Sequence, residues 1–353
     1  MFFEIQSIKK GGIAMSTHVL PLPAHFDEDK VGQLWSVPYQ QRAEEARQWA
    51  RRYHLRPSGE DKKKICLFLI DVQNTFCLPG FELFVGGRSG RGAVEDNIRL
   101  CRFIYRYLGM ITDIYVTLDT HLAMQIFHPI FWVDKNGNHP ESLTLITRRD
   151  IEEGRWRVNP QIISQLDIGS QDYLQRYVLH YTGKLEEKGR FQLMIWPYHA
   201  MKGGIGQAVV PAVEEALFFH SIARNSQTVF INKGENPLTE NYSIFAPEVL
   251  EDFADQPVGK RDWKLFEKLI GYDWVIIAGQ AKSHCVAWTV ADLLAMIKKE
   301  DKKLADKFYL LEDCTSPVVV PGVVDFSRSA DEAFAAFVQA GMHVIKSTDP
   351  LGF

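Results

Sequence analysis

The sequence predicts an α/β fold, with an open, mainly parallel β-sheet and helices on both faces. Short apolar runs recur from residue 65 onward, and amphipathic stretches with helical spacing separate them. Continuous apolar runs of this length are typical of parallel strands that are buried on both faces. A chain of 353 residues can bury the core that such a sheet needs.

The N-terminal part of the chain differs from the rest. Residues 1–62 are expected to form an extension with one helix, at 39–53, in a stretch rich in Glu, Arg, Gln and Ala. Residues 63–353 are expected to form the α/β domain. Its six predicted strands are 66–70, 114–118, 229–231, 274–278, 308–311 and 343–345. Helical spacing is clear at 94–107 and 285–299.

An insertion at about 129–190 interrupts this alternation. We expect a helical stretch there, followed by a hairpin near residues 190–195. Because it has few apolar residues for a core of its own, we interpret it as a lid or a dimer arm rather than a domain.

Composition narrows the possible partners. A net charge of -4 and a pI near 6.3 provide no general attraction to nucleic acid or to an anionic membrane surface. No stretch approaches the roughly 20 apolar residues that a membrane-spanning helix needs. Five scattered cysteines without a CxxC pair indicate free thiols, and so a cytoplasmic protein. A small neutral molecule is the expected partner.

Polar side chains follow four of the predicted strands at the point where each strand ends. They are Asp71, Asp119 with His121, Lys233, and the loop that leads to Cys285. Ligands of open α/β sheets bind outside the carboxyl ends of the strands. The common position of these residues therefore predicts one active site.

Cys285 is the candidate nucleophile. It follows a strand and a tight loop at the start of a helix, where unpaired N–H groups and the helix dipole favour a thiolate. Asp71 ends a strongly apolar strand and could exchange a proton with it. Each residue also has a structural interpretation: a buried small cysteine, a strand-end aspartate and, for Lys233, a surface lysine.

Several short motifs resemble those of the isochorismatase-like cysteine hydrolases, and within them the nicotinamidase branch. Together they extend from about residue 65 to 344. They are Asp-Val-Gln-Asn-Thr-Phe at 71–76, Gly86-Gly87, Lys233-Gly234, Tyr-Ser-Ile-Phe at 242–245, Cys285-Val286 and Leu-Glu-Asp-Cys-Thr at 311–315.

The resemblance implies an isochorismatase-like, Rossmann-like fold and a catalytic triad of Cys285, Asp71 and Lys233. Asp71 would accept the thiol proton, and Cys285 would attack an amide carbon to form a thioester with loss of ammonia. The backbone N–H groups of Ala281 and Cys285 would form the oxyanion hole. Family members have a cis peptide here, which would be Gln280–Ala281.

A metal site is the second prediction. Asp119 and His121 are two residues apart on an extended chain and so project from one face. His199 ends a Trp-Pro-Tyr-His run that resembles the metal-binding motif of nicotinamidases, and His128 is a further candidate ligand. One carboxylate with two or three histidines suits zinc, or alternatively iron or manganese. In the family, a ring nitrogen of the substrate occupies a remaining position on the metal.

The expected substrate pocket contains Phe76, Trp196 and Tyr242, which could enclose a flat ring, together with Gln280 and His284. The aromatic residues could instead belong to the core, and His284 could be structural.

The leading hypothesis is a nicotinamidase-like amidase, a hydrolase of linear amide C–N bonds that acts on nicotinamide or a similar small carboxamide. One alternative is an enzyme of the same family that hydrolyses a different amide or ureide. Another is a catalytically silent binding protein with the same fold. Relatives often form oligomers, so the resemblance also implies a homo-oligomer.

Overall fold

A six-stranded, fully parallel sheet forms the centre of the computed structural model, which describes residues 19–166, 168–187, 189 and 191–351. All six predicted strands are confirmed. In sheet order they are β12 (His343–Ile345), β9 (Phe308–Leu311), β8 (Trp274–Gly279), β1 (Ile65–Ile70), β2 (Asp113–Asp119) and β7 (Val229–Lys233).

The central strand β1 shows why its sequence is continuously apolar. All six of its side chains are buried, and they alternate between two hydrophobic clusters, one on each face of the sheet. Cys66, Phe68 and Ile70 belong to one cluster, and Ile65, Leu67 and Leu69 to the other. Both faces of the strand are therefore core, as the unbroken apolar run predicts.

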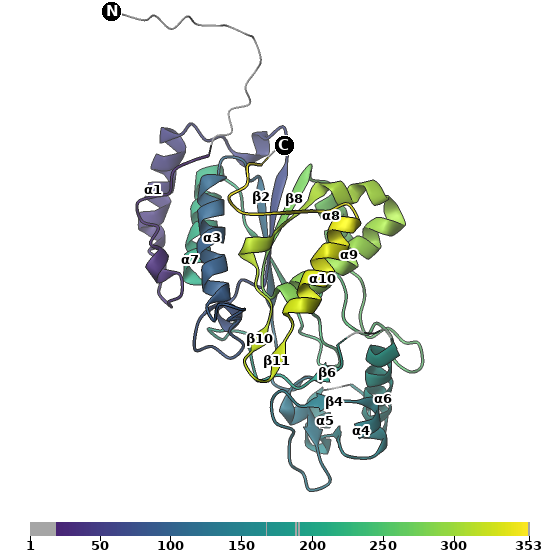
Figure 1. The fold of residues 1–353 in the computed structure, drawn as a ribbon. Helices are drawn as coiled ribbons and strands as arrows, with labels where there is room; N and C mark the ends of the chain where they lie inside the picture. Colours follow the sequence, from purple (N-terminus) through teal and green to yellow (C-terminus); the bar gives the residue numbers. More distant parts are fainter. Residues whose placement is uncertain (1–18, 167, 188, 190, 352–353) are drawn as a thin grey trace, which may run out of the picture.

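Helices cover both faces of the sheet (Figure 1). One face packs against α3 (Gly92–Arg106) and α7 (Pro211–Arg224). The other packs against α8 (Trp263–Ile270), α9 (Ala287–Glu300) and α10 (Ser327–Gln339). The predicted open α/β sheet with helices on both faces is thus confirmed.

The N-terminal extension forms an additional layer outside α7. Its predicted helix is α1 (Tyr39–Arg52), which lies against α7, where the buried side chains of Arg42 and Glu215 form an ion pair. The first 18 residues of the extension lie outside the described residues.

The insertion contains three helices and two small antiparallel sheets. The helices are α4 (Arg148–Glu152), α5 (Ile163–Leu166) and α6 (Gln171–Glu187). One sheet pairs β3 (Trp132–Val133) with β5 (Arg157–Val158), and the other pairs β4 (Leu145–Ile146) with β6 (Leu193–Met194).

Two expectations about this segment are wrong. The chain near 190–195 does not form a local hairpin, because β6 pairs with the distant β4; Arg190 itself lies outside the described residues. The insertion also has a substantial core. Trp132, Tyr177 and Tyr181 are among its fully buried side chains, and they belong to the same cluster as the α8–α10 face of the sheet. Its apolar residues are too scattered along the chain for this to be evident from sequence.

The remaining elements are short. They are α2 (Asn74–Cys77), a hairpin of β10 (Val319–Val320) and β11 (Val324–Asp325), a π-helical turn at Lys282–Val286, and 3-10 turns at Glu28–Lys30, Ser58–Glu60, Pro129–Phe131, Pro160–Ile162, Lys302–Lys307 and Glu312–Cys314.

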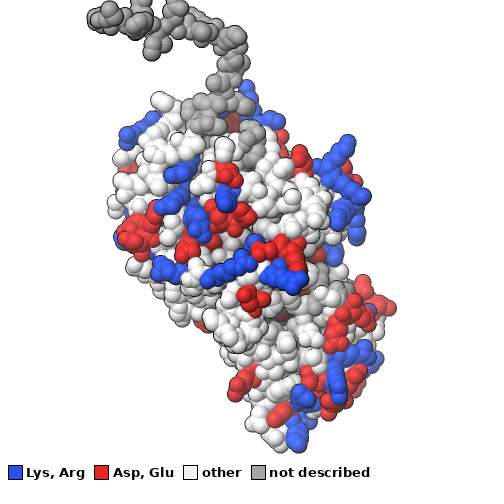
Figure 2. All heavy atoms as spheres, viewed as in Figure 1, with Lys and Arg blue, Asp and Glu red and all other residues white. Residues whose placement is uncertain are grey.

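Basic and acidic side chains are intermixed on the face of the molecule that Figure 2 shows. Among the described residues, the helices are all too short or too polar to cross a membrane.

Replacement of Phe68 by Ala should lower the free energy of unfolding by about 3–5 kcal/mol, because the side chain is fully buried on the central strand and leaves a cavity. Phe230→Ala on the edge strand β7 is the matched control, since that ring is 50% exposed, and it should cost less than about 1 kcal/mol. Urea unfolding of the two variants measures the difference, and equal losses would contradict this account of the core.

Candidate active site

Four adjacent strands, in the order β8-β1-β2-β7, bring the predicted reactive residues to one edge of the sheet. Asp119 and Lys233 are the last residues of β2 and β7, Asp71 directly follows β1, and Cys285 lies in the turn after β8. The structure therefore brings together residues that are as far apart as 71 and 285 in the sequence.

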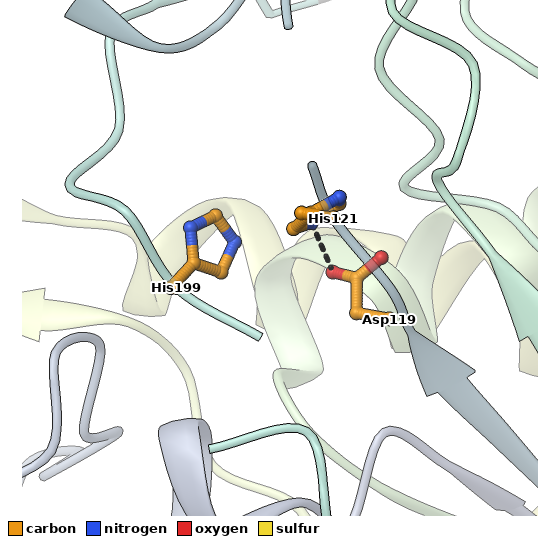
Figure 3. A group of neighbouring side chains, drawn as sticks. All are labelled: Asp119, His121 and His199. Carbon is orange, nitrogen blue, oxygen red and sulfur yellow. Dashed lines mark ion pairs between the residues drawn. The ribbon is translucent and has the colours of Figure 1, made fainter. Parts of the chain in front are cut away.

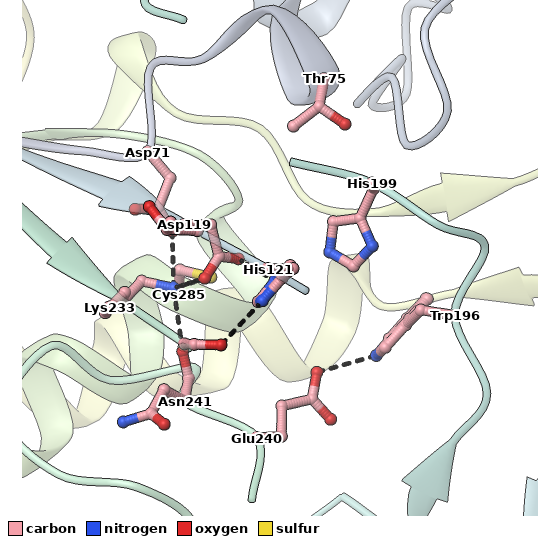
Figure 4. A network of polar contacts seen from close by, with 12 residues as sticks. Asp71, Thr75, Asp119, His121, Trp196, His199, Lys233, Glu240, Asn241 and Cys285 are labelled. Atoms are coloured by element: carbon pink, nitrogen blue, oxygen red, sulfur yellow. Dashed lines mark hydrogen bonds and ion pairs between the residues drawn. The ribbon is translucent and has the colours of Figure 1, made fainter. Parts of the chain in front are cut away.

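Lys233 is at the centre of this group (Figure 4). Its Nζ lies 3.0 Å from Asp71 Oδ2, 2.8 Å from Asp119 Oδ1 and 3.6 Å from Cys285 Sγ, and it also donates to the backbone oxygen of Asn241 at 2.9 Å. Burial alone would lower the pKa of Lys233, but the charges of Asp119 and Asp71 outweigh it and hold the pKa well above its usual value. The lysine therefore remains a cation.

Asp71 is fully buried and has a left-handed backbone conformation, with φ of 49°. Its Oδ1 accepts a hydrogen bond of 2.6 Å from the hydroxyl of Thr117, which in turn accepts from the Asp71 backbone N–H. Burial raises the pKa of Asp71, with the charge of Lys233 opposing that rise. A carboxylate in this setting is a better proton acceptor than one in water.

Cys285 is buried beside these charges. Burial raises the pKa of its thiol well above the usual value, against the effect of Lys233, and the nearby Asp71 carboxylate raises it further by accepting a hydrogen bond from the thiol. The raised pKa favours the neutral thiol, and the Asp71 carboxylate lies within 4.8 Å of it as a proton acceptor. The residue lies in a π-helical turn that precedes α9, rather than in the first turn of a regular helix.

The loop before the nucleophile has the expected cis peptide at Gln280–Ala281. Gln280 does not line the cavity next to Cys285, contrary to expectation. Its side chain is fully buried, donates to Asp96 Oδ2 at 2.9 Å and accepts from the backbone N–H of Ser316 at 3.3 Å. Gln280 therefore ties the loop to α3 and to the chain after β9.

Three of the four predicted metal ligands converge. One ligand atom from each of Asp119, His121 and His199 lies within 4.8 Å of the others, and all three side chains are buried (Figure 3). His121 Nδ1 bonds to the backbone oxygen of Gly234, and His199 Nδ1 bonds to that of Pro197. A backbone partner for one ring nitrogen is the arrangement that orients metal-binding histidines.

The fourth candidate, His128, is adjacent to this group but not part of it. Its ring centre is 6.0 Å from that of His121 and 6.1 Å from that of His199. Its Nδ1 bonds to the backbone oxygen of Leu122, while its buried Nε2 has no partner among the described residues. Burial lowers the pKa of His128 to about 4 and that of His199 well below its ordinary value. Both imidazoles are therefore in the neutral form that can bind a metal ion.

Gly234 permits the close packing of the candidate metal-binding group of Asp119, His121 and His199. Its φ is +84°, and a Cβ at this position would lie 2.6 Å from His121 Cε1 and 2.9 Å from Asp119 Oδ1. The Lys-Gly pair seen in the sequence thus serves both halves of the site: the lysine contacts the thiol and the glycine leaves room for the metal-binding group.

A cavity of about 390 Å³ opens onto one edge of this group, while Asp71, Lys233 and His121 lie behind its wall. Four of the five predicted pocket residues line it, and Asp119, His199, Ala281 and Cys285 line it as well. The four are Phe76, Trp196, Tyr242 and His284. Burial lowers the pKa of His284 to about 3, so its imidazole is neutral, and its ring packs against that of Tyr242.

Sequence reasoning missed two features of this cavity. Glu240 lines the wall, accepts a hydrogen bond of 2.8 Å from Trp196 Nε1, and has its carboxyl pKa raised well above the usual value by burial (Figure 4). A single glutamate in a polar loop gives no local signal of such burial. The hairpin of β10 and β11 also lines the cavity, and its valines at 318–320 and 323–324 are the only signal of this in the sequence.

Searches against family models and against curated proteins found no match. Solved structures that match this chain include a nicotinamidase/pyrazinamidase of Acinetobacter baumanii, with 20% identity and a TM-score of 0.48 over 82% of this chain and 99% of that one. A yeast nicotinamidase matches with 18% identity and the same TM-score, over 80% of this chain and 99% of that one.

A pyrazinamidase of Pyrococcus horikoshii in complex with zinc matches with 18% identity and a TM-score of 0.41, over 80% of this chain and 99% of that one. The names of these three structures are nicotinamidase or pyrazinamidase, and the sequence motifs of this chain resemble those of the nicotinamidase branch. At such identities and TM-scores the likeness decides neither activity nor substrate, which depend on the residues of the site itself.

Replacement of Lys233 by Met should lower the free energy of unfolding of the metal-free protein by about 3–5 kcal/mol, because it leaves two buried carboxylates without their counter-ion. Lys202→Met is the control. That lysine pairs with Glu235 at the surface, where both side chains are about half exposed, and its loss should cost less than about 1 kcal/mol. Chemical denaturation measures the free energy of unfolding of both variants. Similar losses would contradict the prediction, because they would show that groups other than Lys233 compensate the charges of Asp71 and Asp119.

Proposed function

We propose that this protein is a nicotinamidase-like amidase, which hydrolyses a small carboxamide to the carboxylic acid and ammonia through a thioester on Cys285. The observation that carries the proposal is the contact of one buried ammonium, that of Lys233, with both the Asp71 carboxylate and the Cys285 thiol at the wall of a cavity. A nucleophile, a proton acceptor and a fixed cation are the groups that covalent amide hydrolysis needs.

In the first step, Asp71 accepts the thiol proton as Cys285 Sγ attacks the amide carbon. Lys233 offsets the negative charge that forms on the pair, and it does so without solvent reorganisation because it is already in place. The proposed donors to the oxyanion are the backbone N–H groups of Ala281 and Cys285, two residues that line the cavity.

In the second step, Asp71 returns the proton to the departing nitrogen, which leaves as ammonia while the C–N bond breaks. Asp71 then takes a proton from a water molecule as that water adds to the thioester. The C–S bond breaks, the acid leaves, and Asp71 gives this proton to the departing sulfur, which regenerates the thiol. The three groups are thus restored to their starting protonation states.

The donor set of Asp119, His121 and His199 fits a divalent metal ion, with zinc the first choice and iron or manganese the alternatives. His128 lies outside this set, with its ring centre 6.0 Å from that of His121, so we do not count it among the ligands although its buried Nε2 has no partner among the described residues. When bound, such an ion would orient a ring nitrogen of the substrate. Phe76, which packs edge-on to His199, would contact that ring from the side of the cavity.

Two alternatives remain distinguishable by experiment. The same triad could hydrolyse a different amide or ureide, since the insertion contributes Leu143 and Met194 to the wall and so shapes the pocket in a way the motifs do not predict. A silent binding protein would retain the cavity without turnover.

We also propose a cytoplasmic location, which the five unpaired cysteines support, and a homo-oligomeric state.

Replacement of Cys285 by Ala should abolish ammonia release from nicotinamide, with a loss of at least about 10³-fold, because no other group can form the thioester. Cys101→Ala is the control, since that buried thiol lies on α3 and does not line the cavity. A coupled ammonia assay on zinc-loaded protein measures both variants.

The same assay on a panel of small amides and ureides separates the hypotheses. Activity on another amide but none on nicotinamide would select the first alternative. Inactivity on the whole panel, with a Cys285 that no thiol-reactive carbonyl compound labels in the folded protein, would select the silent protein. Activity that survives Cys285→Ala would remove the mechanism.

Replacement of Gly234 by Ala should weaken zinc binding by about 10- to 100-fold, because the new methyl group displaces His121 and Asp119. Gly137→Ala is the control. It has the same backbone penalty, with φ of +87°, but its Cβ meets no atom within 4 Å. Competition with a chromogenic chelator measures the affinity of both, and equal affinities would place the metal elsewhere.

A further inference from the structure

The wall of the cavity has a polar part and an apolar part. Asp119, Cys285 and His199 form a small polar region of the wall. A carboxylate oxygen of Asp119 lies within 4.8 Å of Cys285 Sγ, and a carboxylate oxygen lies within 4.8 Å of a ring nitrogen of His199. Most of the remaining wall is apolar. The hairpin of β10 and β11 and its flanks contribute Val318, Val319, Val320, Val323, Val324 and Phe326.

Hydrogen bonds hold this hairpin in place at its turn and at its base. Pro321-Gly322 forms its turn, closed by a bond of 3.0 Å from the backbone N–H of Val323 to the oxygen of Val320. At its base, the backbone N–H of Val318 donates to the hydroxyl of Ser283, two residues before the nucleophile.

The base of the hairpin is also held by aromatic packing. The ring of Phe326 packs edge-on against that of His284 at 4.8 Å. The hairpin is thus attached to the same loop that carries Cys285.

Two other segments complete the apolar wall. The chain after α2 contributes Phe81, Leu83 and Phe84, and the insertion contributes Leu143 and Met194. In the view of Figure 1, the hairpin lies between the sheet and the insertion. The insertion and the hairpin thus jointly shape the pocket.

Size and charge indicate what this wall binds. A volume of about 390 Å³ falls in the range of pockets that enclose drug-sized ligands, which exceeds what a single-ring amide fills. Lys and Arg are absent from the described residues that line the cavity, so the apolar part of its wall offers no cationic side chain to a phosphate or carboxylate group. Val323 is 61% exposed, which leaves apolar surface for a ligand to cover.

We propose that the preferred substrate is an aryl carboxamide that carries an apolar group, and that the valine-rich hairpin binds this group. The inference rests on the proposed amidase function, because that function places the carboxamide at Cys285. The inference goes beyond that function, because it assigns selection of the substrate to the hairpin and the insertion rather than to the triad or the metal-binding group.

Binding tests the proposal independently of turnover. Zinc-loaded Cys285→Ala protein is titrated by calorimetry with nicotinamide and with nicotinamides that carry a methyl, propyl or phenyl group at each free ring carbon in turn. At the position that points to the hairpin, the propyl compound should bind at least about tenfold more tightly than nicotinamide, because each buried methylene contributes to affinity.

Measurements of turnover test whether the hairpin is the part of the wall that binds the apolar group. In otherwise unaltered enzyme, Val320→Thr combined with Val324→Thr exchanges a methyl for a hydroxyl at two wall positions with little change in shape. The ratio of kcat/KM for the propyl compound to that for nicotinamide should fall about tenfold. Val338→Thr, on an exposed position of α10 that does not line the cavity, should leave this ratio unchanged.

The outcomes separate this inference from the amidase proposal. Cleavage of nicotinamide with no gain from any apolar group, in binding or in turnover, would overturn the inference and leave the amidase intact. Tighter binding of the propyl compound by a protein that cleaves no amide would support the apolar site and remove the amidase. Stronger binding of an aminopropyl than of a propyl group would also overturn the inference, since it would assign recognition to acidic side chains of the wall, such as Glu82, rather than to the hairpin.

Discussion

The buried ammonium of Lys233 is the interaction on which the rest of the site depends. It contacts Asp71 on the side of the thiol and Asp119 on the side of the metal-binding group, so one cation compensates carboxylates from both. Without it, burial of these charges would be strongly unfavourable. Because all of these side chains are at least nine-tenths buried, their interactions are little screened by water. The lysine thereby joins the two halves of the site into one electrostatic unit.

The parallel sheet makes this arrangement possible. Strands that run in one direction deliver their last residues to the same edge, and the pairing of β2 with β7 sets Asp119 directly opposite Lys233. The left-handed conformation of Asp71 turns the chain at the end of β1, and Gly234 leaves the space that the metal-binding side chains occupy. Backbone geometry at the strand ends therefore decides which atoms meet, and the core on both faces of the sheet holds those ends in place.

The parts of the site that the sequence predicted are those with a strong local pattern. Asp71 directly follows an unbroken apolar run, and Lys233 and Cys285 follow such runs after a short interval, so their common edge could be inferred from the residue pattern alone. Gln280 and His128 were harder, because both lie in loops without a regular pattern. The Gln280 side chain is oriented by the distant Asp96 on α3, and that of His128 by the backbone oxygen of Leu122. The core of the insertion also escaped prediction, since its buried residues alternate with polar ones over a long stretch.

The sequence by itself determined the six strands, the order of the elements and the candidate residues at the strand ends, because hydrophobic periodicity and strand-end chemistry are local properties of the chain. The tertiary structure alone decided which of these residues touch, how the valine-rich hairpin and the insertion enclose the cavity, and why Glu240 is buried there. These features depend on contacts between segments that are distant in the chain, and such contacts leave no signal in any single segment. The candidate nucleophile could therefore be identified from sequence, whereas the shape of the pocket it faces could not.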